Sequence, residues 1–376
     1  MKLLHTSDWH LGRSLHGEPM LEHQRTFLRW LVELAVEREV DAVLVAGDVY
    51  DRAVPPTDAV RLLDEALAAF ARASVDVVIT SGNHDSSIRL GFGASLAERA
   101  GVHLRTDLSA LDDPVLLGDL AIYGIPYLLP DAVMADLDAE RSHTSVLSAA
   151  VRRVKDDAAV RGASQIVVLA HAFVTGGAEC ESERDIRIGG IGDVPASVFA
   201  GITYTALGHL HGAQQIRPGI RYAGSPLPYS FSECNQRKSV ALVDIDVGGS
   251  VAVEVVPTPV PRRMAQLRGR LDDLLADRVG PPEDAWLRVV LTDPARPAAP
   301  MERLRERWPR TLVLEFQPDV EPPDAAADLV RLRAQKDPVE ICALFVEWVD
   351  STLPDRHQRD ALSAAVEAVR AAERTA

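Results

Sequence analysis

The sequence predicts an α/β fold with a mixed sheet, followed by a small α+β domain and C-terminal helices. In the first part of the chain, short apolar, β-branched runs alternate with segments of helical periodicity. This alternation is typical of parallel βαβ units. A proline-rich segment at 257–261 then separates this part from a shorter stretch with its own helix and strand patterns. We therefore expect domains at 1–260, 261–320 and 321–376.

The composition of the 376-residue chain is that of an ordinary globular protein, with 47% hydrophobic and 25% charged residues. No apolar run reaches the roughly 18 residues of a membrane span, so we expect no membrane partner. The N-terminus enters a strand pattern without a signal peptide, which predicts a cytoplasmic protein. The formal net charge of −15 argues against nucleic-acid binding by bulk attraction, because such binding normally shows a basic footprint.

The cysteines Cys180, Cys234 and Cys342 are odd in number and far apart in the chain. None of them belongs to a CxxC pair, so neither a disulfide framework nor a thiolate metal site is indicated. We expect these residues to be reduced thiols without a role in the chemistry.

The beginning of the chain alternates predicted strands and helices. A strand at 2–6 precedes a helix at 22–38, whose apolar residues recur at helical spacing. A second strand is predicted at 42–46. The segment 55–58, Pro-Pro-Thr-Asp, is a helix start signal with the threonine as the expected cap. A strand at 75–80 completes this parallel arrangement.

The middle of the chain adds both parallel and antiparallel elements. We expect a helix at 90–100, a short strand at 102–104 and a hairpin over 115–123 that turns at Gly-Asp. A helix at 142–161 leads to a strand at 166–170. The sheet thus acquires an antiparallel part.

The remaining predicted elements lie in the end of the large domain, in the small domain and in the C-terminal segment. Further strands of the large domain are predicted at 203–207, 221–226, 239–245 and 251–256. The small domain is predicted to contain a helix at 265–276, a strand at 286–291, a helix at 301–308 and a strand at 311–316. Two helices, at 338–349 and 356–374, end the chain, and the apolar stripe of the first predicts either a core face or a docking face for a partner helix.

Side chains of the kind that bind metal ions follow five of the predicted strands directly. These side chains are Asp8 and His10, Asp48, Asn83 with His84 and Asp85, His171, and His209 with His211. Ligands of α/β proteins bind at the carboxyl ends of the strands, so we expect these residues to lie at one rim. A long loop rich in Gly, Glu, Ser and Arg at 174–193 follows the fourth of them, and long loops at such positions are often functional.

Each of these strand ends has a simpler interpretation when it is taken singly. Asp8 and His10 are compatible with a surface loop, 83–85 with an Asx turn, and His171 with a satisfied core histidine. The agreement of five separate strand ends favours a metal site. A mixed set of carboxylate, amide oxygen and imidazole suits manganese, iron or zinc in a reactive centre better than it suits a structural zinc site. Two such ions, about 3.5 to 4 Å apart, would hold a phosphodiester between them.

The series of motifs resembles the signature of the calcineurin-like metallophosphoesterases. The motifs are Asp8-x-His10, Gly47-Asp48, Gly82-Asn83-His84-Asp85, His171 and Gly208-His209-x-His211. Within that superfamily, the segments 4–12, 206–211 and 221–226 are similar to those of the SbcD family of nuclease subunits. The loop with Ser182-Glu183-Arg184 and Gly189-Gly190 fits this family too, and so does the helix start at Asp337-Pro338-Val339-Glu340. The resemblance implies a four-layer sandwich of two mixed sheets flanked by helices, with a capping domain and C-terminal helices.

The resemblance also implies roles for individual residues. One ion would be held by Asp8, His10, Asp48 and His211, and a second by Asp48, Asn83, His171 and His209. The two ions are most often manganese in the family, and Asp48 would bridge them. His84 would lie beside the scissile phosphate to stabilise the transition state or protonate the leaving group, with Asp85 as its orienting partner.

The family's substrate is DNA, which it processes in a complex with the coiled-coil ATPase SbcC. The resemblance therefore implies double-strand exonuclease action, single-strand and hairpin endonuclease action, and roles in DNA repair, recombination and replication. It further implies a homodimer within a heterotetramer with the ATPase, in the bacterial cytoplasm and nucleoid. The cap at 261–320 would steer DNA, and the helix at 338–349 would dock on the coiled coil.

Five arginines near the expected site in the sequence are candidate phosphate contacts, although each taken singly is more simply a solvated surface residue. They are Arg13, Arg52, Arg89, Arg184 and Arg187.

Two other functions remain as alternatives. A small-molecule or protein phosphoesterase would share the ligands, and the segment 47–52 is superficially similar to a protein phosphatase motif, although Asp85 stands where those enzymes usually have glutamate. A non-catalytic adaptor of the ATPase would require losses among the ligands, and every ligand position is occupied.

Overall fold

The computed structural model describes residues 1–183, 194–277, 280–319, 335–350 and 352–375. The chain divides into two compact units, Met1–Arg263 and Met264–Ala376. Among the described residues, no helix combines the length and apolar composition that a membrane span needs. The predicted phosphate contacts Arg184 and Arg187 and the segment 189–190 lie outside the described residues.

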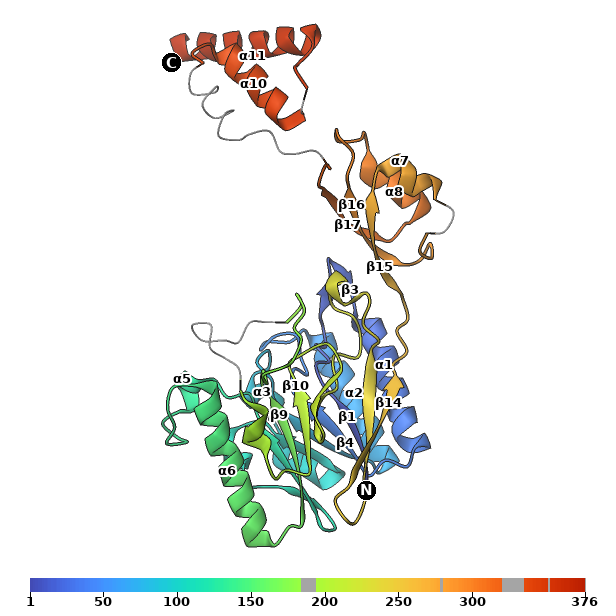
Figure 1. The fold of residues 1–376 in the computed structure, drawn as a ribbon, viewed down its shortest axis with the longest axis vertical. Helices are drawn as coiled ribbons and strands as arrows, with labels where there is room; N and C mark the ends of the chain where they lie inside the picture. Colours follow the sequence, from blue (N-terminus) through green and yellow to red (C-terminus); the bar gives the residue numbers. More distant parts are fainter. Residues whose placement is uncertain (184–193, 278–279, 320–334, 351, 376) are drawn as a thin grey trace. The chain divides into compact units, whose positions relative to one another are not determined.

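Two six-stranded sheets form the centre of the first unit (Figure 1). From edge to edge, the first sheet contains β14 (Val251–Pro257), β13 (Ser239–Ile245), β1 (Lys2–Thr6), β4 (Ala42–Ala46), β5 (Asp76–Thr80) and β6 (Val102–Arg105). The second contains β11 (Gln214–Arg217), β12 (Ile220–Tyr222), β10 (Tyr204–Gly208), β9 (Gln165–His171), β8 (Leu120–Ile125) and β7 (Val115–Leu117). Both sheets are mixed, because β1, β4, β5 and β6 run parallel, as do β8, β9, β10 and β12, while the other strands are antiparallel to their neighbours.

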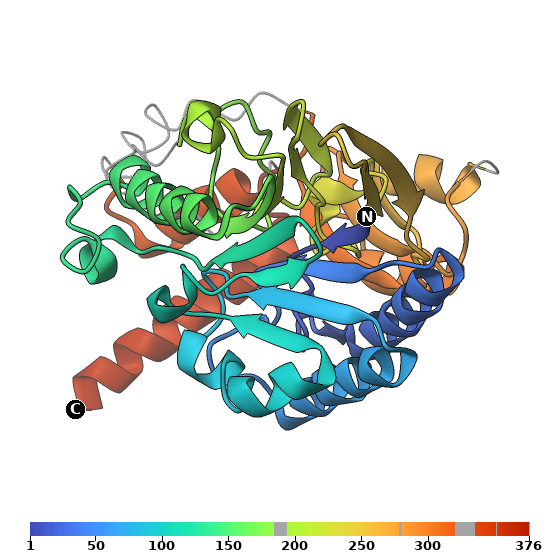
Figure 2. The same cartoon turned by 90° about the horizontal axis from the view of Figure 1, so that it is seen from below.

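Helices cover the outer faces of the two sheets (Figure 2). The first sheet packs against α1 (Leu21–Glu37) and α2 (Thr57–Ala73), and the second packs against α6 (His143–Arg161). Between the sheets lies a third apolar cluster, which includes Leu3, Leu44 and Leu169. The predicted four-layer arrangement of two mixed sheets and flanking helices is confirmed.

Shorter elements connect these layers. They are β2 (Ser14–Leu15), β3 (Glu18–Pro19), α3 (Ser87–Leu90), α4 (Ala94–Ala97), η1 (Glu98–Ala100), η2 (Leu108–Ala110), α5 (Pro130–Val133), η3 (Ala196–Phe199) and η4 (Phe231–Glu233). Beyond Leu90, which ends α3, the segment predicted as a helix at 90–100 is helical only from Ala94, as α4 and η1. The first part of this prediction is wrong, because Gly91 and Gly93 interrupt the helix, and Gly93 adopts a positive φ of 78°. The expected threonine cap of α2 is also wrong, since the cap position belongs to Pro56 and no side chain caps the helix.

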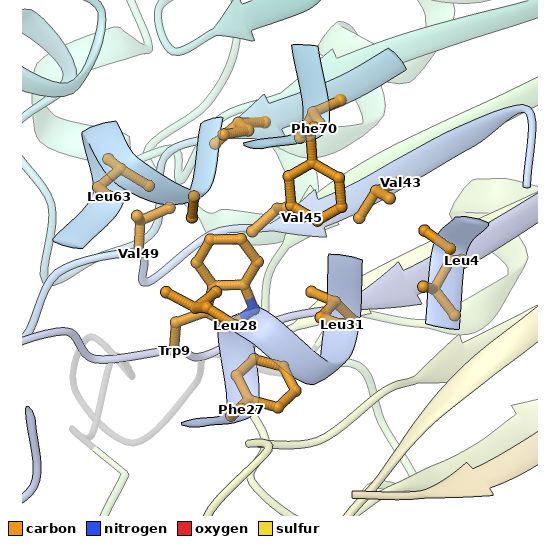
Figure 3. Close-up of a cluster of buried hydrophobic side chains, with 14 of the residues drawn as sticks. Leu4, Trp9, Phe27, Leu28, Leu31, Val43, Val45, Val49, Leu63 and Phe70 are labelled. Carbon is orange, nitrogen blue, oxygen red and sulfur yellow. The ribbon is translucent and has the colours of Figure 1, made fainter. Parts of the chain in front are cut away.

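Trp9 anchors the segment that follows β1. Its side chain is fully buried in the cluster between the first sheet and α1 and α2, where Figure 3 draws it among Phe27, Leu28 and Val45. Its Nε1 donates a hydrogen bond to Thr6 Oγ1 at 3.0 Å. Because this residue stands between Asp8 and His10, its burial in the core fixes the segment from which those two polar side chains extend.

The second unit begins with a parallel βαβαβ arrangement. It consists of β15 (Met264–Gly269), α7 (Leu271–Ala276), β16 (Trp286–Leu291), α8 (Pro300–Arg307) and β17 (Thr311–Phe316). The expected helix at 265–276 is wrong in its first half, which alternates in burial as a strand and pairs with β16. The helices α10 (Pro338–Asp350) and α11 (Arg356–Thr375) follow.

Candidate metal centre

The ligand-type residues come together where five parallel strands end. The strands β1, β4 and β5 are neighbours in the first sheet, and β9 and β10 are neighbours in the second. Among the described residues, four groups of side chains are close enough to hold an ion. Three consist of expected residues: Asp8 with His10 and His211, Asp8 with Asp48 and His171, and His10 with Asp48 and His84. The fourth joins His211 to Cys180 and Glu233.

Two imidazoles face each other on one side of the centre. The Nε2 atoms of His10 and His211 are 3.0 Å apart, and both side chains are buried. Asp8 lies in a group with them, and its carboxylate also accepts hydrogen bonds from the amide of His209 at 3.0 and 3.2 Å. The first set of expected ligands is therefore in one place.

Asn83 joins the imidazoles on the other side. Its Oδ1 is 2.8 Å from His171 Nε2 and 3.2 Å from His209 Nδ1. Asp48 lies between the two sides, because its Oδ2 is 3.7 Å from His10 Nε2 and 3.4 Å from His171 Nε2. The structure thus brings together all seven residues that the sequence proposes as ligands, with Asp48 in the middle.

The backbone at four of these residues is strained. Asp8, His10, Asp48 and His209 have positive φ values of 53°, 45°, 49° and 103°. Few residues other than glycine adopt such values, and they persist only where the surroundings enforce them. The buried Trp9 and the hydrogen bonds from the amides of Asp8 and His10 to the carbonyls of Gly47 and Asp48 supply that enforcement here.

Glycines allow the strand ends to approach one another. A Cβ at Gly208 would lie 1.8 Å from the carbonyl oxygen of Ala46 and 3.0 Å from His171 Nδ1. A Cβ at Gly82 would lie 2.1 Å from Asp48 Oδ1. A Cβ at Gly47 would lie 2.4 Å from His171 Nδ1, and this glycine also has a positive φ of 83°. Close packing therefore requires the glycines that precede His209, Asn83 and Asp48.

The expected pairing of His84 with Asp85 is replaced by other contacts. His84 Nδ1 lies 2.8 Å from the carbonyl oxygen of Asp51, and the amide of His84 donates to Asp48 Oδ1. The Asp85 carboxylate accepts hydrogen bonds from the amides of Gly82, Val49 and Tyr50 at 2.9, 3.1 and 2.9 Å. Asp85 therefore ties the loops after β4 and β5 together, and the carbonyl of Asp51 orients His84 instead.

Burial shifts the pKa values of the carboxylates in this region. It raises the pKa of Asp8 to about 6 and, together with the charge of Asp48, that of Asp85 to about 7. Burial opposes the charged form of His171 as well, but the carboxylate of Asp48 raises the pKa of that imidazole to about 9. Such buried, mutually dependent charges are typical of a site that a cation completes.

The donor set fits divalent ions. It offers two carboxylates, one amide oxygen and four imidazoles without a thiolate, a mixture suited to manganese, iron or zinc. The pair of Nε2 atoms of His10 and His211, buried at 3.0 Å from each other, is a natural place for a shared cation. The Nδ1 of His171 donates to the carbonyl of Ala46 at 2.9 Å, which turns the lone pair of its Nε2 toward the centre.

Sequence reasoning missed Cys180, Ser182 and Glu233 as contacts of this centre. Cys180 forms a group with His211 and Glu233, and its Sγ lies 3.1 Å from Ser182 Oγ. Ser182 Oγ lies 2.8 Å from His211 Nδ1, and the buried Glu233 lies 3.3 Å from the same atom. Burial opposes the charged form of Glu233, but its hydrogen bond with His211 and the charge of Lys238 lower its pKa to about 2. A lone glutamate in a polar turn gives no sequence signal of such a contact.

The described arginine candidates lie near Asp51. Arg13 Nη1 is 3.6 Å and Arg52 Nη2 is 3.8 Å from its carboxylate. Arg13 also donates to the carbonyl of Ser182, whereas the exposed Arg89 donates to the carbonyl of Ala53. These three cations therefore surround the loop whose carbonyl holds His84.

Comparison with known proteins adds two family matches and two similar structures. Residues 260–349 match the model of the SbcD C-terminal family, which is described as the type 5 capsule protein repressor C-terminal domain. The structure of TT1561 from Thermus thermophilus covers 68% of this chain and 98% of its own, with 12% identity and a TM-score of 0.41. A dimetal phosphatase from Danio rerio covers 68% and 96%, with 15% identity and a TM-score of 0.41. Residues 1–213, more than half of the chain, match the model of the calcineurin-like phosphoesterases, so the protein belongs to this family of metal-dependent hydrolases.

Proposed function

We propose that this protein is the nuclease subunit of an SbcCD-type complex, which hydrolyses DNA phosphodiesters in repair, recombination and replication. The observation that carries the proposal is the gathering of all seven side chains expected as metal ligands in a calcineurin-like phosphoesterase domain, followed by a match to the SbcD C-terminal family. The expected activities are those of a double-strand exonuclease and of an endonuclease on single strands and hairpins.

The ligands divide into two sets that share one carboxylate. Asp8, His10, Asp48 and His211 would hold one ion, and Asp48, Asn83, His171 and His209 the other. When bound, two divalent ions, proposed to be manganese, supply a nucleophile from water and neutralise the charge on the phosphate. The position of Asp48, within 4 Å of an imidazole from each set, supports its role as the bridge.

His84 is proposed to act on the substrate itself. A carbonyl oxygen only accepts hydrogen bonds, so Nδ1 of His84 carries the proton that it shares with Asp51. The ring lies against His10 with a centroid distance of 4.7 Å, at the edge of the metal centre. The other ring nitrogen, Nε2, is the atom proposed to donate to the phosphate or to the departing oxygen.

Local cations would compensate for the acidic character of the chain. Arg13, Arg52 and Arg89 gather around the loop that holds His84 and are the proposed phosphate contacts. The small domain at 261–320 is proposed to steer DNA toward the metals, and the ATPase would supply further contacts.

An exposed apolar patch beside these arginines supports a homodimer. Ile88 and Phe92 are 84% and 89% exposed, and Val54, Val60 and Leu96 are exposed as well. The hydrogen bond from Arg89 to the carbonyl of Ala53 brings the two segments that carry the patch together. Large apolar side chains grouped in this way mark an interaction surface.

The dimer is tested by introducing charge into the patch. Phe92→Glu is expected to convert the protein to a monomer in sedimentation velocity. Val247→Glu is the control, because Val247 is 97% exposed and lies between β13 and β14, far along the chain from the patch. A wild-type protein that sediments as a monomer at micromolar concentration would contradict this part of the proposal.

The helix α10 is the proposed docking element for the coiled coil of the ATPase. Phe345, Trp348 and Val349 are exposed on it, and the rings of Phe345 and Trp348 are 6.1 Å apart. Leu353, which follows the helix, is exposed too. Aromatic side chains of this kind are enriched at the centres of protein interfaces.

The proposed activity is tested by degradation of end-labelled duplex DNA with manganese, with and without SbcC. We expect cleavage that the ATPase stimulates and that Asp48→Ala abolishes. A chromogenic phosphomonoester tests the alternative of a small-molecule or protein phosphoesterase. Hydrolysis of that compound without cleavage of any DNA would favour the alternative, and inertness toward both would favour an adaptor.

A further inference from the structure

The buried carboxylate of Glu233 is a part of the metal centre to which the proposed function assigns no task. Glu233 belongs to η4, and its side chain is fully buried. It lies 22 residues after His211 in the chain, yet its Oε1 is 3.3 Å from Nδ1 of that imidazole. A buried carboxylate costs much free energy unless it is paired and hydrogen-bonded, so its contacts are informative.

Glu233 is surrounded mainly by hydrogen-bond donors. The amide of Tyr229 donates to Oε1 at 3.2 Å, and Ser225 Oγ lies 3.3 Å from Oε2, with the carbonyl of Leu227 as a closer acceptor for its proton at 2.9 Å. The ammonium group of Lys238 forms a buried ion pair with Oε2. The same ammonium donates to the carbonyl of His211 at 2.9 Å, so the ion pair is also joined to the backbone of the proposed ligand.

The hydrogen bonds around Ser182 determine where His211 carries a proton. Ser182 Oγ donates to Glu233 Oε1 at 2.5 Å, because a carboxylate can only accept. A hydroxyl has a single proton, so its contact with His211 Nδ1 at 2.8 Å must use a lone pair of the oxygen. Nδ1 of His211 is therefore the donor, both toward Ser182 and toward Glu233.

A proton fixed on Nδ1 leaves the other nitrogen for a metal ion. Nε2 of His211 is the atom that faces His10 Nε2 at 3.0 Å. Histidine ligands commonly donate their second N–H to a carboxylate, which fixes the ring and increases the basicity of the ligating nitrogen. The backbone is held as well, because Glu183 accepts a hydrogen bond from the amide of His211 at 2.5 Å.

We infer that Glu233, acting in part through Ser182, is the positioning residue of His211, and that it holds the proton on Nδ1 so that Nε2 is presented to the first ion. This inference rests on the proposed function, since it assumes that His211 is a ligand. Lys238 stabilises the carboxylate in its charged form, which is the form that can only accept.

The variant Glu233→Gln tests the role of the carboxylate. The amide oxygen would satisfy Lys238, so the amide nitrogen would face Nδ1 of His211 as a second donor and favour the wrong tautomer. We expect affinity for Mn²⁺, measured by calorimetry without DNA, to fall about 10- to 100-fold. Glu254→Gln removes the same charge from an exposed side chain and is expected to leave the affinity unchanged.

Lys238→Met separates positioning from structural support. This variant breaks the same ion pair and is expected to lower the melting temperature. It keeps the carboxyl group beside His211, where the hydrogen bonds from Ser182 and from the amide of Tyr229 still favour the charged, accepting form. Affinity for Mn²⁺ should therefore survive better in Lys238→Met than in Glu233→Gln. An equal loss in the two variants would overturn the inference, because the ion pair would then be only structural.

The wild-type protein gives a direct readout that does not depend on folding of a variant. Long-range ¹H–¹⁵N spectra should show a proton on Nδ1 of His211 both without metal and with Zn²⁺ bound. A proton on Nε2 alone would overturn the inference. Neither measurement uses DNA, so failure of the proposed nuclease activity would be seen separately, as absence of cleavage with this protonation pattern intact.

Discussion

His171, the last residue of β9, and His211, in the loop after the neighbouring β10, both face the metal centre, yet they are held in different ways. Nδ1 of His171 donates to the backbone carbonyl of Ala46, which belongs to the adjacent sheet. Nδ1 of His211 is held by side chains, Ser182 from the loop that follows β9 and Glu233 from η4. One imidazole is thus oriented by the sandwich itself and the other by residues added around it.

This difference indicates where substitutions can act. The anchor of His171 is a main-chain atom, so only a change that moves the two sheets apart will remove it. The anchor of His211 consists of side chains, so single substitutions can weaken it without disturbing the sheets. Single substitutions are therefore expected to change the metal affinity of the His211 side of the centre. The His171 side depends on the packing of the two sheets.

Asp48→Ala should have the largest effect, because Asp48 is the carboxylate that both sides share. If the transition state loses several kcal/mol of charge stabilisation, the rate of DNA cleavage should fall at least roughly 10³-fold. Gel assays with manganese measure this change. The control is Asp58→Ala on the exposed surface of α2, and comparable activity of the two variants would refute a bridging role for Asp48.

His84→Gln should slow DNA cleavage while keeping both sides of the metal centre. The amide of residue 84, which donates to Asp48, is retained, so uptake of Mn²⁺ should persist. The rate of DNA cleavage is expected to fall by about 10²- to 10⁴-fold, as for loss of a proton donor. Loss of metal together with activity would instead assign His84 to the ligands.

Gly208→Ala tests the backbone anchor of His171. The new methyl group would lie 1.8 Å from the carbonyl of Ala46, the same atom that accepts from His171. Overpacking of this kind costs about 1 to 3 kcal/mol of unfolding free energy, measured by urea denaturation. Gly212→Ala is the control, since its nearest contact is 3.4 Å away on a glutamine side chain. Equal stability of the two variants would argue against the anchor.

Ser182→Ala should have the smallest effect and bear only on His211. Glu233 remains beside Nδ1 at 3.3 Å, so the tautomer should be preserved. The loss of one hydrogen bond corresponds to about 1 kcal/mol, or roughly a fivefold weaker affinity for Mn²⁺ in calorimetry. A loss as large as that of Glu233→Gln would mean that the hydroxyl, rather than the carboxylate, is the main anchor.

The sequence predicts the residues that directly follow strands, but it does not predict the side chains that hold them from other loops. Asp8, Asp48, Asn83 and the histidines stand directly after strand patterns, so their gathering at one rim could be expected from chain order alone. The helix expected over the first half of 265–276 is wrong, because alternating burial in a small sheet is visible only after the strands pair.

Contacts between separate loops could not be predicted in the same way. Adjacency in the chain suggests that Asp85 orients His84, but its carboxylate binds amides of both neighbouring loops. Glu233 follows no strand, and its link to His211 is made only when η4 folds over the ends of the sheets. Nothing in the local pattern around either residue specifies these partners.

The most direct test of the account is a crystal structure of the protein soaked with Mn²⁺, measured at the manganese absorption edge. Two anomalous peaks are predicted, one beside His10 and His211 and the other beside Asn83, His171 and His209, with Asp48 touching both. A single peak, or peaks away from Asp48, would contradict the two-ion centre on which the proposed function depends.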